Sequence, residues 1–526
     1  MLGLKSTMQA AGLAATLAIA LGAAQAHAAT PCEEAAKAAL PDGKVVSAEL
    51  VDAGAVMAPT GATPADKAAL AALPALCRVS AQLKPSADSL INIEVWLPTA
   101  GWNGKLVESG NGAFSPALPY GAMAAALQRG YAATASDTGH QDNSANFALG
   151  HPEKLIDFGY RAVHENAVAA KLIVAAYYTA GASKAYFQGC STGGRQAYGE
   201  AQRYPADFDG IVAGDPGIRF VHQTGAELWT IKYIHDHPES LISKPKLKML
   251  HDAVIAACDG LDGVKDGVIE NPLRCKFDPI AIQCRHAEGP DCLTQAQVTL
   301  VRRLYAGTKD SKGRQVFPGL TRGSEVGWGN ALIRTEPLEY GLDAFRLVAM
   351  QNPDWQFTSM DLDRDIPAAD ASVGPIVNND DTNLKPFFAR GGKLIGYHGG
   401  ADPMTTAMSS VVYYQAVAAR SGGSKALSNH YRLFLVPGMF HCVGGDGPST
   451  FDMLSALDQW VETRTPPRSI PVALVRDGQV ARTRPLCPFP QQAIYKGKGN
   501  TDQAQNFYCG IAGAGQGATP ASKGAH

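Results

Sequence analysis

The strongest constraint on the fold of this chain is the segment YFQGCSTGGRQ at residues 186–196. Within it, Gly189-Cys190-Ser191-Thr192-Gly193 matches the pattern G-x-S-x-G, between an apolar strand-like run and a helix-compatible run. A sharp turn from strand to helix excludes bulky side chains around the serine, and the helix N-terminus beneath it favours negative charge. The pattern predicts a nucleophile elbow with Ser191 at its tip. An ordinary Gly/Ser turn is the alternative, and the adjacent Cys190 is a second candidate nucleophile.

Strand-like and helix-like segments alternate on both sides of this turn. Strand-like runs lie at residues 104–112, 131–140, 184–190, 208–216, 392–403 and 431–442, and helix-like runs at 164–178, 193–204 and 409–420. Short buried strands that alternate with helices predict a mostly parallel sheet. The alternation stops after residue 216 and resumes near 388. Because about 500 residues exceed what one compact core usually holds, residues 217–387 are predicted to form an inserted domain.

Two residues at later strand ends complete a candidate catalytic triad. A serine nucleophile needs a base, and the base needs an orienting acid. In α/β-hydrolases these follow in the order Ser, Asp or Glu, His, each on a loop after a strand. Asp402 in IGYHGGADPM and His441 in LVPGMFHC fit that order, whereas His398 precedes the candidate acid. The order predicts Ser191, Asp402 and His441 as nucleophile, acid and base.

The first 28 residues have the pattern of a secretory signal peptide. Lys5 supplies a positive end, residues 9–24 form an Ala/Leu-rich run, and Ala26-His27-Ala28 fits a small-x-small cleavage site. A transmembrane anchor is the weaker interpretation, because the run is short and ends in a cleavage pattern. We therefore expect a secreted or periplasmic protein that begins near Ala29. Its formal net charge of -2 gives no reason to expect nucleic-acid or membrane partners.

Export changes what the cysteines imply. The 10 cysteines are even in number and contain no C-x-x-C pair, which favours disulfides over metal ligands or free thiols. Cys190 directly precedes Ser191, and Cys442 directly follows His441. If the serine and histidine lie within hydrogen-bond reach, these two cysteines are close enough to form a bridge. That interpretation makes Cys190 a covalent staple and leaves Ser191 as the nucleophile.

The arrangement of Cys-Ser, Asp and His-Cys resembles the tannase and feruloyl esterase family, which includes mono(2-hydroxyethyl) terephthalate hydrolase. The resemblance covers nearly all of the chain after the signal peptide. It implies an α/β-hydrolase core that cleaves esters of aromatic acids and carries a lid. The predicted organisation is a signal peptide at 1–28, a catalytic domain at 29–216 and 388–511, a lid at 217–387 and, from its Gly/Ala/Ser-rich composition, a disordered tail at 512–526. The resemblance also implies the remaining disulfide pairs: Cys32 with Cys77, Cys258 with Cys275, Cys284 with Cys292, and Cys487 with Cys509.

The lid segment CDGLDGVKDGVIENPLRC at residues 258–275 is a candidate calcium site. Asp259, Asp262 and Asp266 place hard oxygen ligands in a glycine-punctuated loop, although the spacing is not that of an EF-hand. A solvated acidic turn is the alternative. The family resemblance favours structural calcium in the lid, with the carbonyls of Val264 and Val268 completing the ligand set. No organic cofactor is expected.

An ester hydrolase of this type needs two N–H donors for the developing oxyanion, one of them from the residue after the nucleophile. That residue is Thr192. The second candidate is Gly112 in the loop ESGNGAF, where the family usually has a run of glycines and this chain has Ser109-Gly110-Asn111-Gly112. A plain hairpin turn is the alternative for this loop.

The substrate is the property that the sequence defines least. A planar acyl group gains most from stacking on rigid aromatic side chains. Trp328 and Phe345 in the lid are candidates for such a pocket wall, and so are Trp229 and Trp355. Any of the four could equally be part of the lid core. Arg334 and Arg346 are candidates for binding a free carboxylate on the substrate, but no motif in the sequence supports either of them. The prediction is a serine esterase that cleaves hydroxycinnamic or gallic esters through an acyl-enzyme. A terephthalate monoester hydrolase, a lipase or polyester depolymerase, and a non-catalytic calcium-dependent binding protein are the alternatives.

Overall fold

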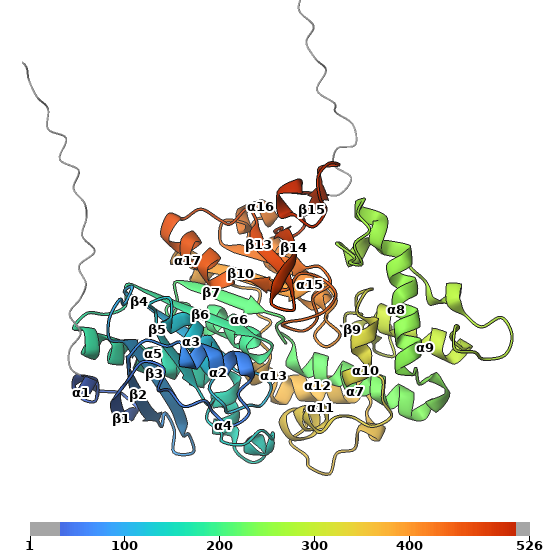
Figure 1. Cartoon of the computed structure of the whole chain (residues 1–526). Helices are drawn as coiled ribbons and strands as arrows, with labels where there is room; N and C mark the ends of the chain where they lie inside the picture. The colour runs from blue at the N-terminus through green and yellow to red at the C-terminus, as the bar shows by residue number, and fades with distance from the viewer. Residues whose placement is uncertain (1–31, 512–526) are drawn as a thin grey trace, which may run out of the picture.

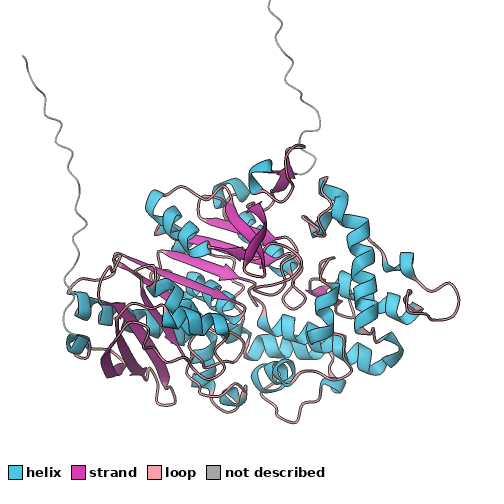
Figure 2. Cartoon of the chain, in the orientation of Figure 1, coloured by secondary structure: helices cyan, strands magenta, loops and turns pink. Residues whose placement is uncertain are grey.

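The computed structural model describes residues 32–511, so the predicted signal peptide and C-terminal tail lie outside the described residues. Figure 1 shows a sheet-containing body with a largely helical body beside it, and Figure 2 shows that the strands concentrate in the first of these. Within the described part of the chain, no helix is long and apolar enough to cross a membrane.

A nine-stranded sheet forms the centre of the first body, in the order β1-β2-β3-β5-β4-β6-β7-β10-β11. The strands are β1 (Gly43–Val51), β2 (Leu76–Leu83), β3 (Ile91–Pro98), β4 (Lys105–Ser109), β5 (Ala132–Ser136), β6 (Lys184–Cys190), β7 (Gly210–Gly214), β10 (Lys393–Gly399) and β11 (Tyr431–Val436). Every pair from β5 to β11 in this order is parallel, while the pairs among β1, β2, β3 and β5 are antiparallel. The mostly parallel sheet is confirmed, and the antiparallel strands β1 to β3 extend it beyond the prediction.

Two hydrophobic cores lie on opposite faces of this sheet. Adjacent strand residues point to opposite faces, so Tyr186 packs in one core and Phe187 in the other. Both faces of the parallel strands are covered, which explains why these strands are continuously apolar. The helices that cover the sheet are α3 (Tyr120–Leu127), α5 (Ala162–Tyr178), α6 (Thr192–Arg203), α15 (Ala407–Arg420) and α17 (Met453–Thr463). Shorter helices of this body are α1 (Cys32–Ala35), α2 (Pro64–Ala71), α4 (Pro152–Ile156) and α16 (Ser424–Leu427).

Between β7 and β10 the chain forms a mostly helical insertion where the lid was predicted, called the lid below, and none of its strands joins the main sheet. Its helices are α7 (Phe220–Asp236), α8 (Lys244–Cys258), α9 (Gln295–Ala306), α10 (Trp328–Ala331), α11 (Glu339–Asp343), α12 (Leu362–Ser372), α13 (Gly374–Val377) and α14 (Lys385–Ala389). A hairpin of β8 (Thr308–Lys309) and β9 (Gln315–Phe317) follows α9. The start of α9 is fixed by a capping box, in which Thr294 and Gln297 each accept the backbone N–H of the other. One hydrophobic cluster lies wholly within the lid, and a second joins lid residues to Phe114, Phe147 and Phe158 of the sheet-containing body.

The C-terminal segment adds two small sheets that the sequence pattern did not separate from the catalytic domain. They comprise β12 (Thr450–Phe451), β13 (Ile470–Arg476) and β14 (Gln479–Leu486) in one sheet, and β15 (Gln492–Tyr495) and β16 (Phe507–Gly510) in the other. Arg482 and Arg484 of β14 bind the carboxylate of Asp266 at 3.2 and 2.5 Å. Glu270 accepts the backbone N–H of Ala493 at 2.7 Å. The acidic loop of the lid is therefore attached to the C-terminal strands.

All the expected disulfides form, and no cysteine within residues 32–511 is free. The bridges are Cys32–Cys77, Cys190–Cys442, Cys258–Cys275, Cys284–Cys292 and Cys487–Cys509. The pairing predicted from the family resemblance is confirmed.

Candidate active site

Ser191 lies at the turn between β6 and α6, with backbone angles φ 63° and ψ -120°. This left-handed conformation is strained for a residue with a side chain and is typical of a nucleophile elbow. The neighbouring glycines are required sterically. A Cβ at Gly189 would lie 2.6 Å from the carbonyl carbon of Gly193, and one at Gly194 would lie 2.1 Å from the Gly214 oxygen. Gly189 of the pattern is thus required by close contact with the start of α6, and Gly194, just after the pattern, by close contact with the end of β7.

Asp402 follows β10 and His441 follows β11, the neighbouring strand. The Nδ1 atom of His441 lies 2.7 Å from Oδ2 of Asp402, which leaves Nε2 as the other ring nitrogen. Asp402 is fully buried, and its carboxylate also accepts the N–H of Met404, the N–H of Thr405 and the Thr405 hydroxyl. This contact has the form needed to orient a catalytic base.

The surroundings of Asp402 favour its charged form. Burial by itself raises the pKa of Asp402, but the charge of His441 and hydrogen bonds from His398 and His441 outweigh burial and hold this pKa well below its usual range. His398 is itself fully buried, and burial lowers its pKa. A charged acid beside the ring of His441 stabilises the imidazolium that forms when the base takes a proton.

The disulfide between Cys190 and Cys442 joins the turn that carries Ser191 to the loop that carries His441. Its Cα atoms are 6.0 Å apart, and Ser191 and His441 are the residues adjacent to the two cysteines. No hydrogen bond joins the Ser191 hydroxyl to His441, both of which are described residues. Catalytic hydrogen bonds of this kind often tighten only in the substrate complex. The structure thus brings together Ser191, Asp402 and His441, which the sequence separates by up to 250 residues.

The loop after β4, which carries Gly112, lies against the start of α6, which carries Thr192. The N–H of Gly193 donates to the carbonyl of Asn111 at 2.7 Å, and the Thr192 hydroxyl donates to the carbonyl of Ala113 at 3.1 Å. No atom lies within 4 Å of the position that a Cβ on Gly112 would occupy. Thr192 and Gly112 therefore lie on segments in direct contact, and the space beside Gly112 is open.

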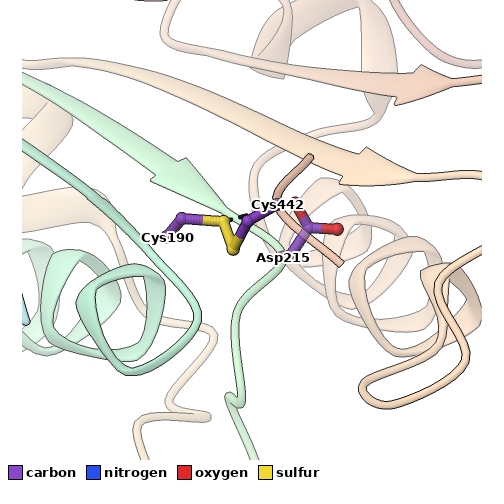
Figure 3. A group of neighbouring side chains, drawn as sticks. All are labelled: Cys190, Asp215 and Cys442. Carbon is purple, nitrogen blue, oxygen red and sulfur yellow. Dashed lines mark hydrogen bonds between the residues drawn. A yellow bond between two sulfur atoms is a disulfide. The ribbon is translucent and has the colours of Figure 1, made fainter. Parts of the chain in front are cut away.

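Three polar residues around Asp402 were not predicted as part of the site: Asp215, His398 and Thr405. Asp215 and His398 are 0 % exposed. Nε2 of His398 lies 3.3 Å from the Asp402 carboxylate, and its Nδ1 lies 2.7 Å from the Ser410 hydroxyl. Asp215 ends the segment FDGIVAGD, a buried strand followed directly by a carboxylate, and that pattern could have identified it. Figure 3 shows Asp215 beside the Cys190–Cys442 bridge.

The predicted calcium ligands lie in one loop of the lid. Asp259 accepts the N–H groups of Asp266 and Gly267, both at 3.1 Å, and Asp262 accepts the N–H of Val264 at 2.9 Å. Burial, and secondarily the charges of Asp266 and Asp259, raise the pKa of Asp262 to about 6. Burial raises the pKa of the nearby Glu270 to about 8.

The acidic loop offers carboxylate oxygens that suit a hard cation, and a bound cation would relieve the repulsion among them. Two features count against a ready-made cage. Asp266 already pairs with Arg482 and Arg484. In addition, these three described residues, Asp259, Asp262 and Asp266, do not bring one carboxylate oxygen each within 4.8 Å of the other two. The donor chemistry therefore fits calcium, whereas the spacing would have to tighten around the ion.

The two aromatic residues proposed for the substrate pocket are both 0 % exposed. Trp328 packs in the lid cluster with Tyr305, and Phe345 packs against Trp355. This burial favours the alternative that they are lid core. Trp229 is half-buried and lines a lid cavity of about 210 Å³.

The arginines considered for a substrate carboxylate have protein partners. Arg346 pairs with Asp343 at 2.6 Å, and Arg334 donates to the carbonyl of Asn330 at 3.0 Å. A separate lid cavity of about 50 Å³ reaches Met404 beside the acid loop, and Gln223 and Glu227 also line it.

Comparison with known proteins identifies the family. A family model described as tannase and feruloyl esterase matches residues 77–510. The chain belongs to the tannase and feruloyl esterase family. It is 35 % identical over 534 residues to an uncharacterized esterase of Xanthomonas campestris pv. campestris, covering 92 % of each chain. It is 32 % identical over 458 residues to a probable feruloyl esterase B-2 of Aspergillus fumigatus, covering 82 % of this chain and 86 % of the relative.

Solved structures agree with this family assignment. Feruloyl esterase B from Aspergillus oryzae superposes with a TM-score of 0.84 at 30 % identity, over 91 % of this chain and 99 % of that one. Tannin acyl hydrolase from Aspergillus niger has a TM-score of 0.74 at 20 % identity over 91 % and 95 %, which supports the fold. The α/β-hydrolase fold predicted from the resemblance is confirmed, and this member of the family is a carboxylic ester hydrolase.

Proposed function

We propose that this esterase is a secreted or periplasmic serine hydrolase that cleaves esters of aromatic acids through an acyl-enzyme. The observation that carries the proposal is the covalent and hydrogen-bonded chain from Ser191 to Asp402. The Cys190–Cys442 bridge holds Ser191 beside His441, and His441 contacts Asp402 at 2.7 Å. The strained backbone at Ser191 supports the role of nucleophile. This arrangement also disfavours a non-catalytic binding protein.

The proposed reaction follows from these positions. The Ser191 hydroxyl attacks the ester carbonyl carbon while Nε2 of His441 takes its proton, and the carbonyl oxygen becomes an oxyanion facing the N–H groups of Thr192 and Gly112. The tetrahedral intermediate expels the alcohol, which leaves with the proton from His441. Water then attacks the acyl-enzyme with His441 again as base, and the free acid leaves as Ser191 recovers its proton. Asp402 keeps the ring of His441 aligned throughout.

The proposed acid is of the hydroxycinnamic or gallic type, with feruloyl esters preferred. Relatives at 32 % identity over most of the chain are named probable feruloyl esterases. A terephthalate monoester is a weaker candidate, because Arg346 and Arg334 are engaged by protein groups and no arginine is assigned to its free carboxylate.

Two further parts of the proposal concern calcium and location. Calcium would be held by Asp259, Asp262 and Asp266 with the carbonyls of Val264 and Val268, and would stabilise the lid without entering the reaction. The hard oxygen donors of this loop and the buried Glu270 next to it support that assignment. An oxidising location is supported by the disulfides, which are rare in reducing compartments.

A comparison of kcat/KM tests the substrate assignment. The panel is methyl ferulate, methyl gallate, a terephthalate monoester and a long-chain aliphatic ester, with Ser191→Ala as the blank. Ferulate or gallate should exceed the other esters by more than about tenfold, which needs about 1.4 kcal/mol of differential transition-state binding. Preference for the aliphatic ester would overturn the aromatic assignment, and preference for the terephthalate ester would reassign the acid.

A further inference from the structure

Asp215 is a buried carboxyl group beside Asp402 and His441, and the proposed reaction does not use it. Asp215 follows β7, which stands between β6 and β10 in the sheet. The carboxyl ends of neighbouring parallel strands meet at one edge, so Ser191, Asp215, Asp402 and His441 follow consecutive strands β6, β7, β10 and β11. Asp215 is 0 % exposed and has φ 36°, a left-handed angle that costs energy for a residue with a side chain. Strain of this kind is often retained where a side chain must point in one direction.

The contacts of Asp215 reach the elements that carry all three triad residues. Its Oδ1 accepts the N–H of Gly399, at the end of the strand before Asp402, at 2.8 Å. Its carboxylate also lies within 4.8 Å of Sγ of Cys442, the residue after His441. Its Oδ2 lies 3.4 Å from Sγ of Cys190, the residue before Ser191 (Figure 3). Because this sulfur is in a disulfide and carries no proton, the last contact is packing.

Asp215 also lies directly against the triad acid. Asp215, Asp402 and His441 each offer an atom within 4.8 Å of the others. The titratable groups that face Asp215 are Asp402, His398, His441 and Tyr397, from β10 and the loops after β10 and β11. Two adjacent buried carboxylates repel each other, so one of them takes a proton.

The surroundings decide which of the two carboxyl groups keeps the proton. Asp402 has two histidines and several donors that favour its charge. Burial, and then the negative charge of Asp402, raise the pKa of Asp215 well above its usual range. The two carboxyl groups have oxygens within 4.8 Å of one another, and only a protonated Asp215 can donate a hydrogen bond to the charged Asp402.

We propose that Asp215 is a positioning residue of the triad, a neutral carboxylic acid that donates a hydrogen bond to Asp402, accepts the backbone N–H of Gly399 and packs against the Cys190–Cys442 bridge. This inference rests on the proposed serine mechanism. One side chain thereby holds the acid loop, the histidine loop and the disulfide in a single arrangement. The loss of Asp215 removes no triad member, but it frees Asp402 to turn and so misaligns His441.

Two substitutions separate positioning from simple packing. Asp215→Asn keeps the size, one acceptor oxygen and N–H donors, and it is neutral at every pH. Asp215→Ala removes donor and acceptor. Glu108→Gln and Glu108→Ala are the matched controls, because Glu108 on β4 is also a buried carboxyl group with a raised pKa but lies beside Asn166 and outside the triad. The readouts are kcat, KM and the pH profile of kcat/KM with p-nitrophenyl acetate, together with the melting temperature.

We expect Asp215→Asn to keep kcat within about threefold of wild type and to leave the acid limb of the pH profile in place. Asp215→Ala should lower kcat by about 30- to 100-fold with KM changed less than about twofold. Its acid limb should move to higher pH, because Asp402 without its donor binds the imidazolium of His441 more strongly. Glu108→Ala should lower the melting temperature but leave kcat and the pH profile unchanged.

Three results would overturn the inference. The first is wild-type kcat and pH profile in Asp215→Ala. The second is an acid limb shifted to lower pH in Asp215→Asn, because removing a charge beside His441 lowers the pKa of the base and would show that Asp215 is ionised. The third is equal loss of kcat in the Asn and Ala variants.

If Asp215→Ala does not fold, the pH profile of Asp215→Asn still decides between a neutral and an ionised Asp215. Full turnover by Ser191→Ala would instead refute the serine mechanism, so the two failures are distinguishable.

Discussion

Cys190 and Cys442 are joined by a disulfide whose Cα atoms lie 6.0 Å apart, although 252 positions separate them in the chain. Ser191 follows the first cysteine and His441 precedes the second. The bridge therefore fixes the separation of the proposed nucleophile and base through covalent bonds. On the chain-entropy model, closing so long a loop stabilises the folded state by about 5 kcal/mol at most.

Replacing both cysteines of this bridge with serine should lower both stability and turnover. We expect kcat to fall at least about tenfold with a smaller change in KM, because catalytic geometry rather than binding is lost. The matched control is Cys284→Ser with Cys292→Ser, which opens a lid bridge across 8 positions. That control should lower the melting temperature less and leave kcat near wild type. Equal kcat in the two double variants would contradict a catalytic role for the bridge.

The triad predicts a graded set of losses. Ser191→Ala and His441→Ala should each lower kcat by about 10⁵- to 10⁶-fold, and Asp402→Asn by about 10⁴-fold. Ser183→Ala is a matched control, because Ser183 is exposed at the other end of β6 and bonds only the carbonyl of Gly104. Circular dichroism should show an intact fold for every variant. Near-normal turnover of Ser191→Ala would show that another residue is the nucleophile.

The sequence predicted those parts of the site that depend on chain order and local geometry. Gly189 is required by contact with Gly193 within the same turn, so the local motif indicates the elbow. The bridge beside it followed from the two cysteines flanking Ser191 and His441. For Asp215 the sequence could indicate only a carboxylate after a buried strand, because its place beside Asp402 depends on strand β7 lying between β6 and β10 in the sheet order.

Other features depend on burial, which a single sequence does not reveal. From the sequence, Trp328 and Phe345 are candidates for the wall of a substrate pocket, but both side chains are 0 % exposed in the fold. The sequence pattern did not predict strand β1, which lies at the edge of the sheet. Val46 and Leu50 of this strand are 57 % and 66 % exposed, so its apolar residues do not mark one buried face.

Removal of calcium should destabilise the lid more than it changes the chemistry. When free calcium is at about 100 times the Kd of the site, binding adds about 2.7 kcal/mol to the free energy of unfolding. A strong chelator should therefore lower the melting temperature by about 5 °C or more. Asp262→Ala should reproduce the effect of the chelator and should not respond further to it. Asp252→Ala is the control, because Asp252 is an exposed lid carboxylate paired only with Lys248. A wild-type melting curve that ignores the chelator would leave the loop as an acidic turn without a metal.

The last prediction concerns a contact between the lid and the loop that carries His441. Nε2 of His251 on α8 lies 3.2 Å from Asp446, and its Nδ1 lies 3.0 Å from Glu325. Burial by itself lowers the pKa of His251, but hydrogen bonds to Asp446 and Glu325 outweigh burial and raise it to about 9. A charged His251 therefore links the lid to the loop that carries His441 at neutral pH.

This link should make stability depend on pH in a defined direction. A pKa raised in the folded state gives stabilisation that is complete below the unfolded value of about 6.5 and is lost as the pH rises through about 9. After allowance for solvent screening, we expect about 1 to 2 kcal/mol between pH 6 and pH 10. His251→Gln should remove that difference, whereas His235→Gln on an exposed lid face should retain it. Unfolding by urea at both pH values measures it. The same loss of stability from pH 6 to pH 10 in wild type and His251→Gln would show that His251 is not the titrating link.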